Sequence, residues 1–294
     1  MTPPADLALA EGTARPWSGP DTLIEPTRGL AALRLRELWN YRELAYFLVW
    51  RDIKVRYKQT VIGVAWAVLQ PLAMMLVFTL FFGKLAKMPS DDIPYPVFAM
   101  AGLLPWQMFS RTLSESASSL VTNQRLVTRV YFPRLLVPLA TVLAAFVDFG
   151  VASALLAVLM VGYRLVPPAG IVWLPVFIAL LLATALGIGL WLAALNAQYR
   201  DVRYTLPFLT QLWLFLTPVV YPSSLVPDRW QVAYGLNPMV GVVEGFRWAL
   251  FGAGQGPSPM LAVSAGAAVF LLVSGLVFFR SRERVFADVL GGGQ

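Results

Sequence analysis

An uncharged run of 23 residues, 61–83, directly follows RDIKVRYKQT, a segment that carries four cations. A transmembrane helix needs about 20 apolar residues to cross the bilayer core. Lys and Arg beside a span stay on the cytoplasmic side of the membrane. The stretch therefore predicts a membrane helix that begins inside the cell and reaches the outer side at Gly83. Because consecutive spans alternate in direction, this helix sets the direction of all the others.

The composition agrees with a chain that crosses the membrane several times. Of the 294 residues, 58% are hydrophobic and 13% are charged, whereas soluble domains carry about 25% charged residues. Cys and His are both absent, which excludes disulfides, thiolate nucleophiles, imidazole bases and His/Cys metal sites. We therefore expect a protein that is not an enzyme and holds no cofactor or metal. The net charge of +7 follows mostly from cations on one membrane face and indicates no nucleic-acid partner.

Hydropathy and charge divide the chain into four parts. We expect a disordered cytoplasmic tail over 1–32, an amphipathic helix at the membrane interface over 33–60, a transmembrane domain over 61–280, and a cytoplasmic tail over 281–294. The predicted fold class is an all-α integral membrane protein. Six spans are predicted within the domain, at 61–83, 96–120, 135–161, 171–195, 205–221 and 260–279. Most of the 23 Lys and Arg residues then lie on the inner side, with both termini in the cytoplasm.

Polar and small residues inside the predicted spans indicate contacts between helices. Arg111 and Glu115 are four apart and can pair on one helix face. Gly187 and Gly189 each follow an Ala by four residues, a spacing that permits close helix contact. Gln70 precedes a proline, and a polar amide beside such a kink should face protein or water rather than lipid.

The segment 222–256 contains an apolar stretch, 238–251, that is too short to span the membrane. This stretch carries Glu244 and Arg247, which are three apart and can pair, and pairing lowers the cost of holding both charges near lipid. We interpret 222–256 as a re-entrant hairpin on the outer side. We predict that it acts as an outer gate through Glu244 and Arg247, with its apolar faces dipping into the outer leaflet.

Five sequence blocks carry a family resemblance. In chain order they are RDIKVRYKQTVIGVAWAVLQP, LVTRVYFPRLLVP, NAQYRDVRY, LNPMVGVVEGFRWALFG and FADVL. Together they resemble the membrane subunit of ABC-2-type polysaccharide exporters, the permeases of O-antigen, capsular polysaccharide or teichoic acid export. The resemblance covers roughly residues 36–290.

The resemblance implies a homodimer of six-helix subunits in the bacterial inner membrane, with two copies of a separate ATPase bound below. It also implies that a glycan linked to polyprenyl pyrophosphate passes between the subunits. The sequence contains no GxxxxGK[ST] phosphate loop. We therefore expect ATP and Mg to bind to the partner ATPase and not to this chain.

A channel for a sugar polymer needs aromatic platforms and few fixed charges, so that the polymer slides rather than sticks. Aromatic residues of the first, second and fifth spans are predicted to line it: Trp66, Phe78, Phe82, Trp106, Phe109, Phe208, Trp213, Phe215 and Tyr221. For any single one of them the alternative is a lipid-facing or core position.

Of the two inner loops, 121–138 alone has room for a helix of its own. Its aromatic residues are surrounded by arginines, a combination typical of compact docking sites. We predict that it couples to the ATPase through Arg125, Arg129, Tyr131, Phe132 and Pro133. The alternative is a loop whose arginines only set the topology.

The interface helix over 33–60 combines Arg and Lys with Trp and Tyr. We predict that Arg51, Lys54 and Arg56 lie near the pyrophosphate of the lipid-linked substrate. The same helix is expected to contact membrane lipids. The alternative is that these cations only anchor the topology.

Two rival functions stay open at this point. A secondary carrier would need buried charges near the membrane midplane, and Asp148 is the residue that qualifies. A membrane-embedded enzyme that processes glycans or lipids would need clustered acids or histidines, and neither is apparent in the sequence.

Overall fold

The computed structural model describes residues 35–58, 63–199, 201–254, 256, 258–283 and 286. These residues form helices, turns and loops without a β-strand, which confirms the predicted all-α class. The predicted tail over 1–32 and most of the predicted tail over 281–294 lie outside the described residues.

Two helices precede the first predicted span, namely α1 (Leu35–Asn40) and α2 (Arg42–Lys58). The longer helices that follow are α3 (Gly63–Phe78), α4 (Tyr95–Thr122), α6 (Leu136–Gly162), α7 (Leu174–Gln198), α8 (Val202–Phe215) and α11 (Pro259–Arg282). The six-residue helix α5 (Gln124–Arg129) lies between α4 and α6. Between α8 and α11 lie α9 (Asp228–Tyr234) and α10 (Pro238–Phe251). Short π- and 3-10-helical segments complete the described fold: η2 (Thr79–Leu85), η3 (Ala169–Trp173) and η4 (Ser223–Leu225).

Four helical segments of the described chain are long and apolar enough to cross a membrane: Ala65–Leu85, Leu136–Gly162, Ala169–Gln198 and Pro259–Arg282. They agree with four of the six predicted spans. The other two predicted spans correspond to α4 and α8. α4 has 28 residues but carries Arg111, Glu115 and several serines in its second half, and α8 has only 14 residues and contains Pro207. A total of six spans therefore stays a prediction.

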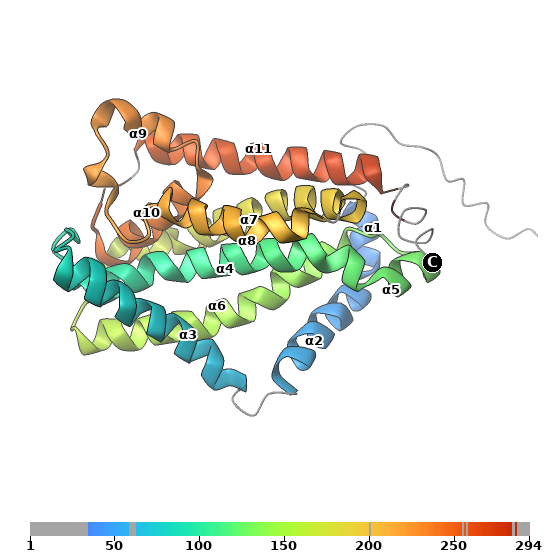
Figure 1. The fold of residues 1–294 in the computed structure, drawn as a ribbon, viewed down its shortest axis with the longest axis horizontal. Coiled ribbons are helices and arrows are strands. Elements are labelled where there is room, and N and C mark those ends of the chain that lie inside the picture. The colour runs from blue at the N-terminus through green and yellow to red at the C-terminus, as the bar shows by residue number, and fades with distance from the viewer. Residues whose placement is uncertain are drawn as a thin grey trace, which may run out of the picture. The chain divides into compact units, whose positions relative to one another are not determined.

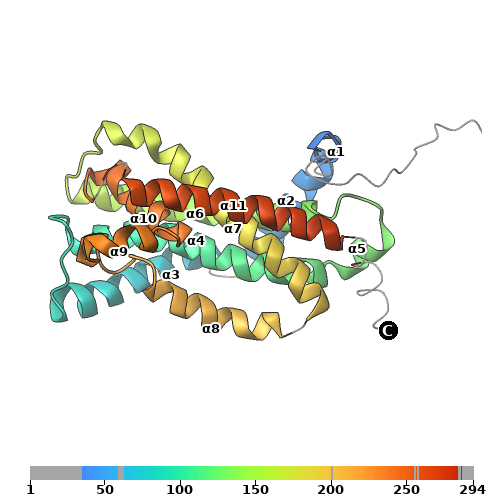
Figure 2. The same ribbon diagram turned by 90° about the horizontal axis from the view of Figure 1, so that it is seen from above.

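α4 lies at the centre of the helical domain. It contacts α3, α6, α7, α8 and α10, and its first half, from Tyr95 to Phe109, is almost entirely buried. α1 and α5 lie at one end of the long helices, and α9 lies at the other end (Figure 1). The ends predicted to be cytoplasmic are thus together. Figure 2 shows α8 along one edge of the domain.

Polar side chains join α4 to its neighbours within the helical domain. The hydroxyls of Ser116 on α4 and Thr141 on α6 are hydrogen-bonded at 3.0 Å. Asn196 on α7 donates its side-chain amide to the Ala117 carbonyl at 2.7 Å. Such hydrogen bonds stabilise the association of helices in an apolar environment, where water is not present to bond to the same groups.

Glycine sets the close packing of α7 against α11. A Cβ atom added to Gly275 would lie 2.2 Å from the Gly187 carbonyl oxygen, and one added to Gly187 would lie 2.6 Å from the Leu271 backbone. A Cβ on Gly189 would lie 2.9 Å from Ser116 of α4. The close contact predicted from the spacing of small residues is therefore confirmed for both Gly187 and Gly189.

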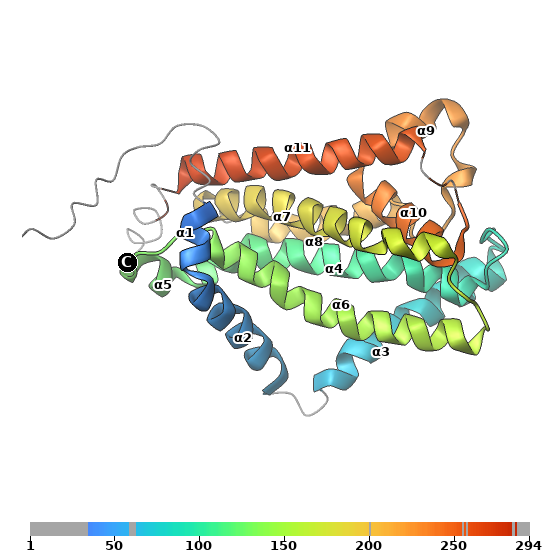
Figure 3. The same ribbon diagram turned by 180° about the vertical axis from the view of Figure 1, so that it is seen from behind.

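α10 is almost entirely covered by protein. Twelve of its residues are buried, and its neighbours are α4, α7 and α11 (Figures 1 and 3). We expected its apolar faces to dip into the outer leaflet, but they pack against these three helices instead. The difference arises because α10 carries small residues that permit close approach; for example, a Cβ on Gly241 would meet the Ser264 side chain of α11 at 2.4 Å.

Arg247 ties α10 to the chain segment that follows α8. Its side chain is 1% exposed and that of Glu244 is 2% exposed, and the two pair at 3.1 Å, which confirms the predicted pairing. The Arg247 guanidinium also donates to the carbonyls of Pro218 at 2.6 Å and Val219 at 2.7 Å. It lies over the Phe98 ring at 3.6 Å from the centroid.

We expect Gly275→Ala to destabilise the protein by about 1–3 kcal/mol, because the added methyl group has no room against Gly187. Gly266→Ala is the matched control, since Gly266 lies in the same helix and has no atom within 4 Å of an added Cβ. Thermal unfolding of the detergent-solubilised protein measures both. Equal melting temperatures for the two variants would contradict the packing described for α7 and α11.

We expect Arg247→Lys to cost about 3–5 kcal/mol, because a single ammonium cannot serve Glu244 and two carbonyls in the planar geometry of a guanidinium. Arg229→Lys is the control, because Arg229 is exposed on α9. The measurement is the yield of monodisperse protein during heating. An Arg247→Lys variant as stable as wild type would show that the carbonyl contacts are dispensable.

Candidate functional site

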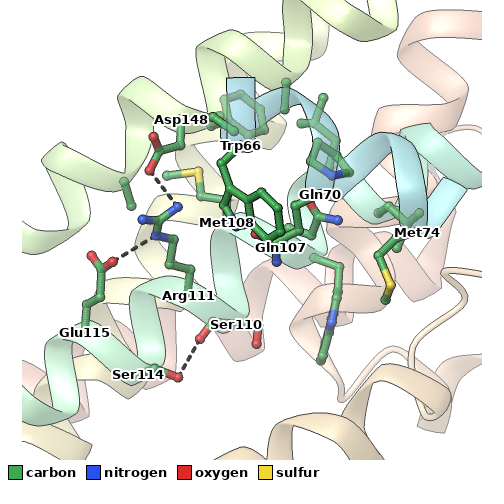
Figure 4. A pocket seen from close by; sticks show the side chains of 18 of the residues that line it. Trp66, Gln70, Met74, Gln107, Met108, Ser110, Arg111, Ser114, Glu115 and Asp148 are labelled. Carbon is green, nitrogen blue, oxygen red and sulfur yellow. Dashed lines mark hydrogen bonds and ion pairs between the residues drawn. The ribbon is translucent and has the colours of Figure 1, made fainter. Parts of the chain in front are cut away.

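Four charged side chains meet where α2, α4 and α6 approach one another. Arg56 of α2 pairs with both Glu115 oxygens at 2.7 Å, and it also pairs with Asp148 of α6. Arg111 pairs with Glu115 at 2.8 Å and with Asp148 at 2.9 Å (Figure 4). The Tyr57 hydroxyl donates to Asp148 as well. We name Arg56, Arg111, Glu115 and Asp148 the charge cluster.

The charge cluster contains two cations and two anions, so its net charge is zero. Each member is at least partly shielded from solvent, with side-chain exposures of 13–39%. Shielded pairs interact more strongly than surface pairs because the local dielectric constant is lower. Burial and the hydrogen bond to Asp148 raise the pKa of Tyr57 to about 12. The Tyr57 hydroxyl therefore stays protonated, and remains a donor, at cellular pH.

The sequence predicted only part of the charge cluster. The pairing of Arg111 with Glu115 is confirmed. Arg56 and Asp148 are 92 positions apart, and no local pattern links them. The signal that could have pointed to them is that a lone Asp in an apolar span requires a cationic partner.

A cavity of about 630 Å³ lies next to the charge cluster, between α3, α4 and α6. Arg111, Glu115 and Asp148 line it together with polar and aromatic residues (Figure 4): Trp66, Gln70, Gln107, Ser110 and Ser114. Trp66 and Ser114 are exposed, so the cavity opens to the surface of the described domain. Gln70 lies in its wall, as expected for an amide beside a proline kink.

The three cations predicted to lie near pyrophosphate are placed differently from one another. Arg51 pairs with its neighbour Asp52 at 2.8 Å, Lys54 is exposed, and Arg56 belongs to the charge cluster. α2 packs against α6 (Figure 3). Its outer side exposes Tyr46, Phe47 and Trp50, a pattern typical of a helix at a membrane interface.

The aromatic residues predicted to line a channel fall into two groups. Trp66, Phe208 and Phe215 are exposed on α3 and α8. The others are buried or half-buried between helices: Phe78, Phe82, Trp106, Phe109, Trp213 and Tyr221. Within this group the rings of Phe109 and Trp213 pack edge to face with centroids 5.1 Å apart. The structure therefore does not bring all nine onto one surface.

The predicted coupling loop 121–138 contains the short helix α5. Arg125 and Arg129 are exposed on α5, and Tyr131 is 75% exposed beyond it. Phe132 is 5% exposed and belongs to a core cluster that includes Leu48 and Val127, and Pro133 is also buried. Of the two predicted aromatic contacts, only Tyr131 presents its ring at the surface.

Arg134 fixes the end of the same loop. Its backbone amide donates to the Glu283 carboxylate at 3.0 Å, and its side chain donates to the Glu283 carbonyl. The loop is therefore attached to the end of α11. The predicted gate residues Glu244 and Arg247 form the buried pair described above and lie away from the cavity.

The chain is similar to one family model and to several known proteins. The family model described as ABC-2 type transporter matches residues 43–251. A Myxococcus xanthus protein named O-antigen export system permease protein RfbA is 34% identical over 259 residues, which cover 86% of this chain and 98% of that protein. A Klebsiella pneumoniae protein of the same name is 26% identical over 82% of this chain and 92% of its own length.

A third relative carries a different name. The polysialic acid transport protein KpsM of Escherichia coli is 26% identical over 238 residues, which cover 79% of this chain and 91% of that protein. Because the family model matches more than half of the chain and the Myxococcus relative aligns over nearly its whole length, the chain belongs to the ABC-2 type transporter family.

Proposed function

We propose that this chain is the channel-forming permease subunit of an ATP-driven exporter, and that it moves a lipid-linked polysaccharide from the cytoplasm across the bacterial inner membrane. The observation that carries the proposal is the 34% identity to an O-antigen export permease over 98% of that relative. The similarity to a polysialic acid transport protein supports the same class of substrate. A polyprenyl pyrophosphate is the proposed lipid carrier, and both chain termini are proposed to lie in the cytoplasm.

The proposed assembly has two copies of this chain and two copies of a separate ATPase that binds ATP and Mg. We place the second copy of the chain against apolar side chains that are exposed on α8 and just beyond it, and that would otherwise face lipid. They are Phe208, Leu209, Leu212, Phe215 and Leu216. Arg125 and Arg129 of α5, together with Tyr131, are the surface that we propose for the ATPase.

The charge cluster argues against a secondary carrier. Asp148 was the candidate for an ion-coupling site, but it is already bonded to Arg56, Arg111 and Tyr57. A carboxylate compensated in this way has little affinity left for a coupling cation.

The test of the proposed function is complementation. A strain that lacks its polysaccharide permease should regain surface polysaccharide when this chain is expressed together with its partner ATPase. The ATPase should co-purify with the chain, and its hydrolysis rate should rise in the complex. Absence of export from a well-expressed pair would refute the proposal.

We expect Tyr131→Ala to abolish or strongly reduce export while changing the unfolding free energy by no more than about 0.5 kcal/mol, because Tyr131 is exposed. Phe132→Ala should instead destabilise the chain by about 3–5 kcal/mol, since it removes a buried ring. Tyr163→Ala, at the carboxyl end of α6 and thus at the other end of the helices, is the control. Normal export by the Tyr131→Ala variant would move the docking site elsewhere.

We also expect different effects from Arg56 and Lys54, two of the α2 cations predicted to lie near the pyrophosphate. Arg56→Gln should lower stability by a few kcal/mol as well as export, because it leaves Glu115 and Asp148 undercompensated. Lys54→Gln should lower export alone if Lys54 contacts the pyrophosphate, since Lys54 is exposed. Export and melting temperature measured on the same variants distinguish these effects. If Lys54→Gln exports at the wild-type rate, Lys54 serves only as a topology anchor.

A further inference from the structure

We infer that the cavity between α3, α4 and α6 binds a neutral glycosyl segment of the exported polymer. This inference rests on the proposed function and assigns a substrate chemistry to one site within a single subunit. The lining residues of this site lie on α3, α4 and α6 and, through Leu214, on α8.

The charge of the cavity favours a neutral ligand. Arg111 is the cation in its wall, and it is compensated by Glu115 and Asp148 at 2.8 and 2.9 Å. An anionic ligand would have to displace these carboxylates and leave them near apolar helices, which is costly. A polyol has no such cost, and it can accept from a guanidinium and donate to a carboxylate at once.

The cavity wall also provides uncharged hydrogen-bonding groups. Gln70, Gln107 and Ser110 line it along with the exposed Ser114. Ser114 donates to the Ser110 carbonyl at 3.2 Å, so its oxygen is still able to accept. The Gln107 side-chain Nε2 is buried and has no hydrogen-bond partner among the described residues. Buried donors are rarely left unpaired, and a sugar hydroxyl is a suitable acceptor for this one.

Trp66 provides the apolar surface that a pyranose ring requires. Its side chain is 58% exposed, and Figure 4 places it among Gln70, Gln107 and Arg111. A sugar ring presents C–H groups on its faces and hydroxyls around its edge. An indole platform flanked by amides and an ion pair therefore matches both parts of the ring.

The size and opening of the cavity suit part of a chain rather than a free monosaccharide. A volume of about 630 Å³ lies within the range of about 300–1,000 Å³ for ligand sites and leaves room for a short run of pyranose rings. Trp66, Met74 and Ser114 at its rim are exposed. The cavity is therefore open on this side of the single chain.

The experiment measures equilibrium binding to the full-length chain in complex with its ATPase, in lipid nanodiscs. The first probe is a neutral oligosaccharide released by mild acid from the polysaccharide that the host cell exports. The second probe is undecaprenyl diphosphate without sugar. The oligosaccharide should bind, and Trp66→Leu should weaken its binding at least tenfold. Gln107→Met, which keeps the side-chain size, should weaken it several-fold.

Trp173→Leu is the matched control, because Trp173 is exposed on η3 and does not line the cavity. It should bind the oligosaccharide as wild type does. Ser114→Trp is a second variant that fills the exposed rim of the cavity without disturbing a buried position, and it should also abolish binding. It serves as the test if Gln107→Met proves unstable.

Wild-type affinity for the oligosaccharide in Trp66→Leu and Ser114→Trp would overturn the inference. A second result would also overturn it: the wild-type chain binds undecaprenyl diphosphate but not the oligosaccharide, and the variants lose that binding of the diphosphate lipid. Failure of the proposed function is seen separately, because the wild-type chain would then not restore surface polysaccharide in the complementation strain. If wild type restores export and the variants bind normally, only the assignment of the cavity falls.

Discussion

Charges placed among apolar helices must be compensated by other protein groups, because water is scarce there and ionised side chains are costly to desolvate. In this chain the charge cluster joins α2, α4 and α6, and Arg247 joins α10 to the segment after α8. Each grouping holds together elements that are distant in the sequence. The first grouping helps to hold α2 against α6, the helix that forms one wall of the cavity.

Much of the architecture could be predicted from the sequence, because hydropathy and short spacings are local properties. Four predicted spans agree with apolar helices, the pairs Arg111–Glu115 and Glu244–Arg247 form, and Gly187 packs closely against α11. In each case a period of three or four residues places the partners on one helix face, or an uncharged run is long enough to span the bilayer.

The remainder depends on tertiary contacts that no local pattern encodes. The pairing of Arg56 with Asp148 crosses 92 positions. Phe132 is buried in the second core cluster, whose members come from helices as distant in the sequence as α2, α7 and α11. The burial of α10 could not be distinguished from an interfacial helix by its apolar composition, because both environments select the same residues. The nine aromatic residues predicted to line a channel divide into exposed and buried ones. The sequence could not predict this division, because hydrophobicity alone does not tell which neighbour a ring contacts.

The contacts between α10 and the end of α8 have a mechanical consequence. Arg247 binds the carbonyls of Pro218 and Val219, and Asn237 at the start of α10 accepts from Trp213 and donates to the Leu216 carbonyl. These two attachments lie at the last turn of α8 and at the residues that follow it. A shift of this end of α8 along its axis would have to break these hydrogen bonds or carry α10 with it.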